Sequence, residues 1–160
     1  MLYILIVISE VIALRVVRIH IEKNMQLDDS KEIMNGKVTL KKQYNRGMFL
    51  NLLEDKVDTV KKISVVLLGV LLLTFAILLP KKNNRLFKLA ISLCLGGAIS
   101  NVYERLRRGY VTDYFSFNCK PLKSIVFNLA DMCIILGSFL LLLISLFSPK
   151  CKCSTDKASK

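Results

Sequence analysis

The stretch GGAISNVYERLRRGYVTDYF, from Gly96 to Phe115, decides how the rest of the chain is arranged. It begins inside an apolar segment and carries an aspartate, Asp113, close to its end. A second aspartate, Asp131, follows in the sequence FNLAD inside another apolar run. A carboxylate that has no function is energetically costly in a membrane. Two aspartates in or next to membrane segments therefore predict a functional site.

The bulk composition is typical of a membrane protein. The 160 residues are a single-domain length, and 53% of them are hydrophobic, with a mean hydropathy of +0.47 that is too high for an ordinary soluble domain. In a soluble protein the formal net charge of +12 would suggest nucleic acid. Here the basic residues lie between long apolar runs, so positive loops and anionic lipid headgroups explain them better. We expect membrane lipids as partners, and no nucleic acid.

Four apolar runs predict four membrane-spanning helices in one membrane domain, 1–160, of the mainly α class. The first run follows Met1 directly, without a basic region or a cleavage site, so we expect a retained helix and not a removed signal peptide. Arg15 and Arg18 are expected to reach from this helix toward the interface. The spans are placed at about 2–19, 63–79, 86–103 and 125–147, with extracytoplasmic loops at about 20–62 and 104–124 and a cytoplasmic tail at 148–160.

The orientation follows from the basic residues at the ends of the spans. Four spans put both termini on one side, together with the basic turn at 80–85 and the Lys-rich tail. The positive-inside rule makes that side the cytoplasm. Asp113, after the third span, and Asp131, about two turns into the fourth, then both lie near the outer side. Topology alone is expected to bring them together.

The long loop at 20–62 carries signs of local structure. Residues 37–45 alternate imperfectly between apolar and polar and predict a short strand, after which Asn45, Arg46 and Gly47 predict a turn. Residues 48–53 are apolar enough to rest on a membrane surface. The five cysteines of the chain are odd in number and have no accompanying ligand cluster, so they predict neither a disulfide framework nor a metal site. No metal and no cofactor are expected.

Two carboxylates held close together cannot both ionise, so they share one proton. One can then take a proton from water while the other polarises a carbonyl, as in aspartic proteases. Asn101 and Asn128 have amides that can hold a carboxylate or a substrate carbonyl, and Arg105 lies on the same helical face as Asn101. Spacing alone leaves other interpretations open. A carboxylate-lined pathway for ions or protons fits nearly as well, and Asp131 by itself could be structural.

The motifs around the two aspartates resemble those of the signal peptidase II, or lipoprotein signal peptidase, family. The shared pattern is a small-residue run, an asparagine, an acidic-Arg pair, a Gly-x-Val-x-Asp stretch ending on an aromatic residue, and Phe-Asn-x-Ala-Asp. In this chain it comprises Gly96-Gly97-Ala98, Asn101, Glu104-Arg105, Gly109 to Tyr114 and Phe127 to Asp131, and an upstream element at Asn45 to Phe49 is similar.

The resemblance implies an intramembrane aspartic endopeptidase with Asp113 and Asp131 as its catalytic pair. It implies that the remaining site residues shape the site and hold substrate: Asn45, Gly47, Asn101, Arg105 and Asn128. The substrate would be a bacterial prolipoprotein, cut just before its diacylglyceryl-modified cysteine, in the cytoplasmic membrane. The implied fold is a monomeric four-helix bundle with a small extracytoplasmic sheet, drawing strands from about 37–44 and 110–117, and an interfacial helix at 48–53.

The chain departs from the family pattern and is expected to be a divergent member. Glu104 stands where the family usually has Asp. In the first span the family has an Asp followed four residues later by Lys, whereas here Glu10 is followed by Leu14 and Arg15 comes one residue late. Met48 and Phe49 stand where the family has one more residue, including an alanine. The alternative to an enzyme is a non-enzymatic membrane carrier, or an inactive relative, that binds lipidated peptides.

Overall fold

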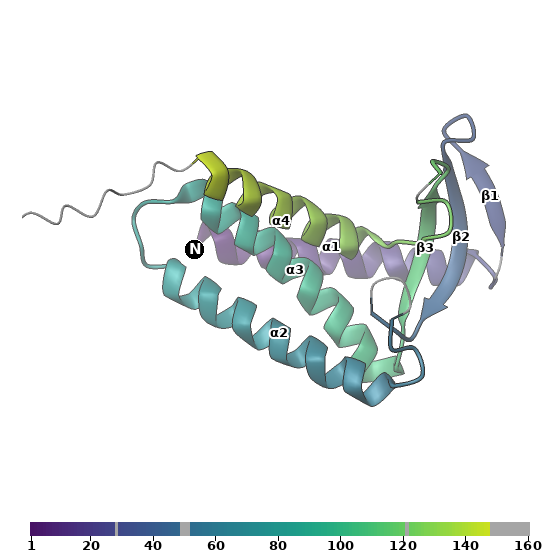
Figure 1. The fold of residues 1–160 in the computed structure, drawn as a ribbon, viewed down its shortest axis with the longest axis horizontal. Coiled ribbons are helices and arrows are strands. Elements are labelled where there is room, and N and C mark those ends of the chain that lie inside the picture. The colour runs from purple at the N-terminus through teal and green to yellow at the C-terminus, as the bar shows by residue number, and fades with distance from the viewer. Residues whose placement is uncertain (28, 49–51, 121, 148–160) are drawn as a thin grey trace, which may run out of the picture.

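A computed structural model describes residues 1–27, 29–48, 52–120 and 122–147. Its helices run back and forth along one axis, and a small sheet lies at one end of them (Figure 1). Three of these helices pack against the same central one, α3. The described helices are α1 (Leu2–Asn24), α2 (Val57–Leu78), α3 (Arg85–Arg108) and α4 (Leu129–Phe147).

Small residues let α3 and α4 approach closely. A Cβ atom at Gly97 would lie 2.5 Å from the backbone oxygen of Ala130, and one at Gly137 would lie 2.6 Å from the backbone oxygen of Ala90. Neither position has room for a larger side chain, which is the packing that membrane helices favour. The close approach brings the last turns of α3 beside the first turn of α4, where Asp131 is located.

Among the described residues, three helices are long and apolar enough to cross a membrane: α2, α3 and α4. The expectation of four spans is therefore confirmed for three helices. The remaining helix, α1, has 23 residues and is about 35 Å long at 1.5 Å per residue. It carries Glu10, Arg15 and Arg18 in its central part, which lowers its mean hydropathy.

The helix ends differ from the predicted bounds for local reasons. Helix α2 begins at Val57 instead of 63. Its polar first turn contains an ion pair between Lys61 Nζ and Asp58 Oδ1, which lie 3.8 Å apart. Helix α3 continues to Arg108 instead of 103, so residues 104–108 are helix and not loop. It ends at Gly109, whose φ of 80° is left-handed and favours glycine. Helix α4 begins at Leu129 instead of 125, so Asp131 lies in its first turn and not two turns into it.

The sheet has three antiparallel strands in the order β1-β2-β3 within the described chain, namely β1 (Ser30–Ile33), β2 (Val38–Asn45) and β3 (Val111–Phe117). The strands predicted at about 37–45 and 110–117 are confirmed, whereas β1 was not predicted. One extra residue on β2, between Leu40 and Gln43, makes a bulge against β3. The buried Lys42 lies in this bulge, and its Nζ donates to the backbone oxygens of Glu22 and Met25 at the end of α1. Lys42 thus connects strand β2 to the end of helix α1.

Two of the predicted segments lie wholly or partly outside the described residues. The interfacial helix expected over 48–53 includes residues 49–51, and the tail expected over 148–160 is outside them entirely. The described residues that follow the gap at 49–51, from Leu52 to Asp55, form a turn before α2.

Candidate active site

Asp113 in β3 and Asp131 in α4 are joined through Asn128, which lies immediately before α4. The Asn128 side-chain amide donates to Asp113 Oδ1 at 2.7 Å, and its backbone N–H donates to Asp131 Oδ2 at 3.1 Å. In return, the backbone N–H of Asp131 donates to Asn128 Oδ1 at 3.1 Å. The last two bonds form a capping box at the start of α4. The helix cap and the link between the two carboxylates are therefore the same residue.

Asp113 is held from its other side by Asn45, the last residue of β2. Asn45 pairs with Val111 in the sheet, so it is a diagonal neighbour of Asp113, and its Nδ2 donates to Asp113 Oδ2 at 3.0 Å. The Asp113 side chain is 3% exposed. Burial, followed by the negative charge of Asp131, raises the pKa of the Asp113 carboxyl to about 7, although the amides of Asn128 and Asn45 act in the opposite direction. Asp113 can therefore carry a proton at neutral pH.

Asp131 is held by α3. Asn101 Nδ2 donates to Asp131 Oδ1 at 2.8 Å. One turn further along α3, Arg105 Nη2 donates to the backbone oxygen of Gly47 at 3.0 Å. This bond ties the bend after β2 to the helix, and it places a positive charge close to both aspartates.

A pocket of about 350 Å³ opens onto these side chains. One end is polar, and the remainder is a wall of aliphatic side chains from α2 and α4, among them Leu67, Leu71 and Ile134. Two buried polar atoms of residues that line the pocket, Asn45 Oδ1 and Arg105 Nε, have no hydrogen-bond partner in the described part of the chain. The pocket therefore has amide, guanidinium and carboxylate groups at one end and apolar surface beyond them, and two buried polar atoms of its lining residues are left unpaired.

The structure brings together all seven residues that the sequence singled out. Six of them line the pocket, and Gly47 contributes the backbone oxygen that receives Arg105. Within the described ranges, no three His, Cys, Asp or Glu side chains converge as a metal ion would require. The six lining residues are Asn45, Asn101, Arg105, Asp113, Asn128 and Asp131.

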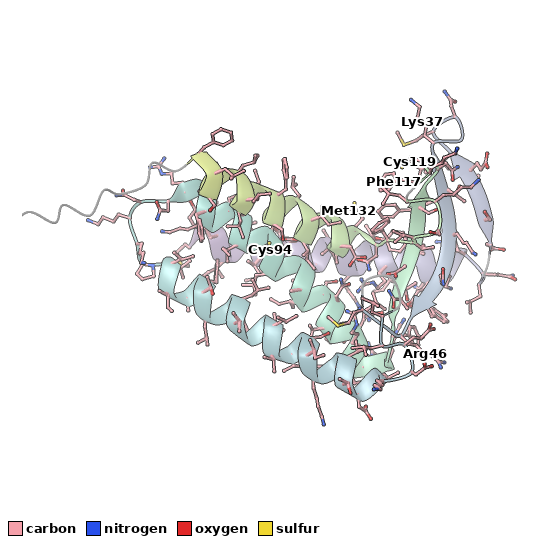
Figure 2. The ribbon with its side chains drawn as sticks, viewed as in Figure 1. Lys37, Arg46, Cys94, Phe117, Cys119 and Met132 are labelled. Atoms are coloured by element: carbon pink, nitrogen blue, oxygen red, sulfur yellow. The ribbon has the colours of Figure 1, made fainter. Side chains whose placement is uncertain are left out.

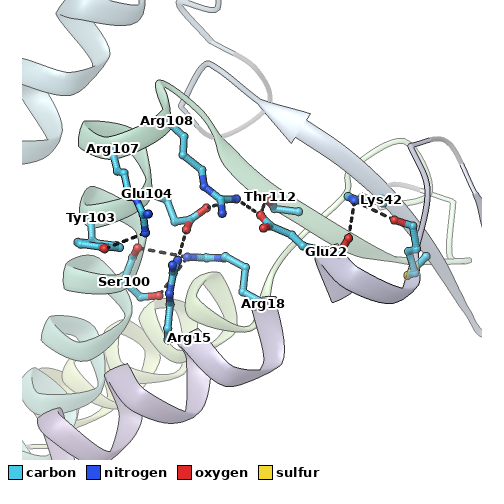
Figure 3. Close-up of polar contacts among 11 residues, drawn as sticks. Arg15, Arg18, Glu22, Lys42, Ser100, Tyr103, Glu104, Arg107, Arg108 and Thr112 are labelled. Carbon is cyan, nitrogen blue, oxygen red and sulfur yellow. Dashed lines mark hydrogen bonds and ion pairs between the residues drawn. The ribbon is translucent and has the colours of Figure 1, made fainter. Parts of the chain in front are cut away.

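Sequence reasoning missed Arg18. The expectation that it reaches the interface is wrong, because it is 2% exposed and bonds to Ser100 of α3 (Figure 3). It also bonds to Asn101 of the same helix. The sequence did contain a signal. The buried residues of α1 are Val7, Leu14 and Arg18, whose spacing of seven and four places them on one stripe facing α3.

Sequence reasoning also missed the charged network around Glu104, which is completely buried. Arg15 Nη1 donates to Glu104 Oε1 at 2.6 Å, and Arg108 lies 3.7 Å from Glu104 Oε2. Arg108 also pairs with Glu22, which accepts a bond from Thr112 Oγ1 at 2.9 Å (Figure 3). Charges thus link α1, α3 and the start of β3 outside the pocket.

Glu10 of α1 lies against α3 and does not line the pocket. Its carboxylate presses against Gly96, where a Cβ atom would lie 2.3 Å from Glu10 Oε2. Gly96 is five residues before Asn101 along α3. Glu10 therefore belongs to the packing between α1 and α3, and it is Arg18 that extends from α1 to the site.

The fold and the pocket together indicate an integral membrane protein with two neighbouring aspartates at the polar end of an apolar pocket. Two solved structures of bacterial membrane enzymes have the same fold. One is 25% identical with a TM-score of 0.80, covering 99% of this chain and 94% of the other. The second is 26% identical with a TM-score of 0.77, covering 92% and 94%.

Curated relatives agree with this class. The lipoprotein signal peptidase of Halothermothrix orenii is 32% identical over 89% of this chain and 93% of its own length. That of Moorella thermoacetica is 33% identical over 76% and 77%, and that of Clostridium tetani is 28% identical over 88% and 89%. The model of the signal peptidase II family matches residues 4–147. The chain belongs to the signal peptidase II family.

Proposed function

We propose that this chain removes signal peptides from bacterial prolipoproteins as an aspartic endopeptidase, cutting just before the diacylglyceryl-modified cysteine. Membership of the signal peptidase II family supports the substrate and the protease activity. The observation that carries the catalytic assignment is the joining of Asp113 and Asp131 through Asn128 at the polar end of a largely apolar pocket.

The pair has what a metal-free hydrolysis requires. One ionised aspartate takes a proton from water, whose oxygen attacks the scissile carbonyl carbon, while the protonated aspartate donates to the carbonyl oxygen. The tetrahedral intermediate then collapses. The C–N bond breaks, and the leaving nitrogen takes the proton that came from water. As the C=O bond re-forms, the proton on that oxygen returns to the aspartate that donated it. The buried position of Asp113 supports its role as the proton donor at neutral pH.

The rest of the pocket matches a lipidated peptide. The side chains of Asn45, Asn101 and Arg105 line the polar end, and amide and guanidinium groups can hydrogen-bond the backbone of a peptide substrate. The aliphatic wall formed by α2 and α4 offers apolar surface to the acyl chains of the modified cysteine. These features favour a substrate that has both a peptide and a lipid part.

Cleavage of a purified precursor tests the proposal. The chain in detergent is expected to cut a diacylglyceryl-modified precursor. It is expected to cut the same precursor without lipid at least about 100-fold more slowly, because the acyl chains hold the peptide at the aspartate pair. Mass spectrometry of the new N-terminus locates the cut. Tight binding of the lipidated precursor without turnover would instead favour a carrier or an inactive relative.

We also propose that α1 crosses the membrane with α2, α3 and α4, that both termini are cytoplasmic, and that the chain acts as a monomer. The length of α1 supports the fourth crossing. The N-terminus and the end of α4 lie at the end of the bundle opposite the sheet (Figure 1), beside the turn that carries Lys81, Lys82 and Arg85. The positive-inside rule supports placing that end in the cytoplasm and the aspartate pair on the extracytoplasmic side of the membrane.

A cysteine provides a test of this orientation. Cys119 is exposed beside the sheet, whereas Cys94 lies inside the bundle (Figure 2). A membrane-impermeant maleimide added to intact bacterial cells that express the chain, with the outer membrane opened where one is present, is expected to label the protein at Cys119. Cys119→Ser is expected to abolish that label. Equal labelling of the two proteins in intact cells, or labelling of Cys119 only after lysis, would contradict the proposed orientation.

The shared proton predicts a pH dependence. Because Asp113 has a pKa of about 7, its proton is present below pH 7 and is lost as the pH rises through that value. The rate of cleavage is therefore expected to fall above pH 7, approaching about tenfold per pH unit. Initial rates between pH 5.5 and 9.5 measure this, with return to pH 6.5 as the control for damage. A rate that stays constant to pH 9 would contradict a protonated Asp113.

A further inference from the structure

We propose that Arg18 is a positioning residue for the aspartate pair and that it acts through Asn101. This rests on the proposed function, in which Asp131 is one of the two catalytic groups. Arg18 comes from α1, and no residue of α1 lines the pocket, so Arg18 can affect the aspartate pair only through the residues that it contacts.

The contacts form a chain from α1 to Asp131. Arg18 Nη2 donates to Asn101 Oδ1 at 3.0 Å, and Asn101 Nδ2 donates to Asp131 Oδ1 at 2.8 Å. Arg18 Nη1 also donates to the backbone oxygen and the Oγ of Ser100, each at 3.2 Å, which anchors the guanidinium against α3. Arg18 is therefore fixed independently of Asn101.

The donor and acceptor groups fix the direction of each hydrogen bond between Arg18, Asn101 and Asp131. A guanidinium can only donate hydrogen bonds, so the oxygen of the Asn101 amide must face Arg18. The amide nitrogen must then face Asp131 and donate to it. If Arg18 were removed, the Asn101 amide could turn over and present its oxygen to the carboxylate, which cannot donate while it is ionised. Arg18 thus keeps Asn101 in the orientation that holds Asp131.

The surrounding charges show why Arg18 differs from the other arginines of this region. Arg15 and Arg108 pair with the carboxylate of Glu104. In the described chain, each hydrogen-bond partner of Arg18 is a neutral group. A buried cation without a direct counter-ion is costly. The negative charge of the aspartate pair, one amide away, offsets that cost, which explains the presence of a charged residue on the buried stripe of α1.

A double-mutant cycle tests whether Arg18 acts through Asn101. Arg18→Met is expected to lower kcat about 10- to 100-fold and to leave KM within about twofold, because the substrate-binding groups are untouched. In an Asn101→Ala background the same change is expected to have almost no effect. Arg18→Lys, which keeps a charged donor, is expected to restore most of the rate. Arg107→Met is the matched control, because Arg107 is exposed and donates to Tyr103, and its rate is expected to be unchanged.

A measurement that does not depend on turnover follows the amide itself. With asparagine labelled by nitrogen-15 and the protein in detergent, the side-chain amide signal of Asn101 is identified by its loss in Asn101→Ala. It is expected to shift or broaden in Arg18→Met and to stay in place in Arg18→Lys and Arg107→Met. Should Arg18→Met not fold, Arg18→Gln takes its place in both experiments.

The outcomes separate this inference from the proposed function. If the unmodified chain does not cleave a lipidated precursor, the proposed function fails, and the Asn101 signal still decides whether Arg18 orients the amide. If the chain cleaves but the losses from Arg18→Met and Asn101→Ala multiply, the inference is overturned. It is also overturned if the Asn101 signal is unchanged in folded Arg18→Met.

Discussion

Asp113→Asn lowers the turnover of a lipidated precursor by at least about 1,000-fold, because an amide can neither give nor take the shared proton. The fold is expected to survive. Asn128 still has its capping bonds to Asp131, and Asn45 can turn its amide so that its unpaired Oδ1 accepts from the new side chain. Single-turnover cleavage with enzyme in excess measures the loss.

The same variant is expected to unfold at a higher temperature than the unmodified chain at pH 8. The folded-state pKa of Asp113 is raised, so the stability that its protonated form retains in acid is lost as the pH rises toward 7. Asparagine removes the buried charge, and the difference should shrink toward pH 4. Asp58→Asn is the matched control, since its side chain is 90% exposed, and it should change neither quantity. Full turnover by folded Asp113→Asn would contradict the assignment.

Glu104→Gln is expected to lower the free energy of unfolding by about 3 kcal/mol, because removing one partner of a buried ion pair leaves the other charge uncompensated. Arg15 would lose its 2.6 Å partner and Arg108 one of its two carboxylates. The value lies at the lower end of the usual range because 29% of the Arg15 side chain is exposed to solvent. Denaturant unfolding in mixed micelles measures the change.

Glu104→Asp separates charge from length at this position. The shorter side chain keeps its charge but draws back from Arg15, so the loss of stability should be smaller than that of Glu104→Gln and still clear. Arg107→Gln, an exposed change on the same turn of α3, is the control and should stay within about 0.5 kcal/mol. A Glu104→Gln protein as stable as the control would show that the network contributes nothing to the fold.

Much of the site could be predicted because residues that are close together in the sequence determine it. Asn101 and Arg105 are four residues apart on a helix, so they share a face whatever the tertiary structure. Gly109 belongs to the motif that ends near Asp113, and its left-handed backbone ends α3 just before β3. The strand over 37–45 delivered Asn45 to the same place.

The features that could not be predicted from the sequence depend on contacts between segments that are far apart in it. The bulge in β2 that fixes Lys42 beneath α1 has no signal in local alternation. The strand β1 has four residues, mostly polar, so no pattern marked it. The burial of Glu104 becomes visible only when α1 packs on α3. The spacing that puts Arg18 on one stripe with Val7 and Leu14 does not by itself distinguish a buried arginine from an exposed one. Glu10, Arg15 and Arg18 lower the mean hydropathy of α1, although all three contact α3.

The departure at Glu104 is explained by the structure. The longer side chain reaches Arg15 on α1 as well as Arg108 on its own helix, and neither contact touches the pocket. The change therefore concerns the joint between α1, α3 and β3, and not the aspartate pair.

The central claim is that Asp113 and Asp131 act as one unit. Single-turnover rates for Asp113→Asn, Asp131→Asn and the double variant, each shown to be folded, test it most directly with one lipidated precursor. Groups that act as a unit have non-additive effects, so each single variant is predicted to lose about as much activity as the double variant. Losses that multiply in the double variant, or cleavage that persists in either single variant, would contradict the claim.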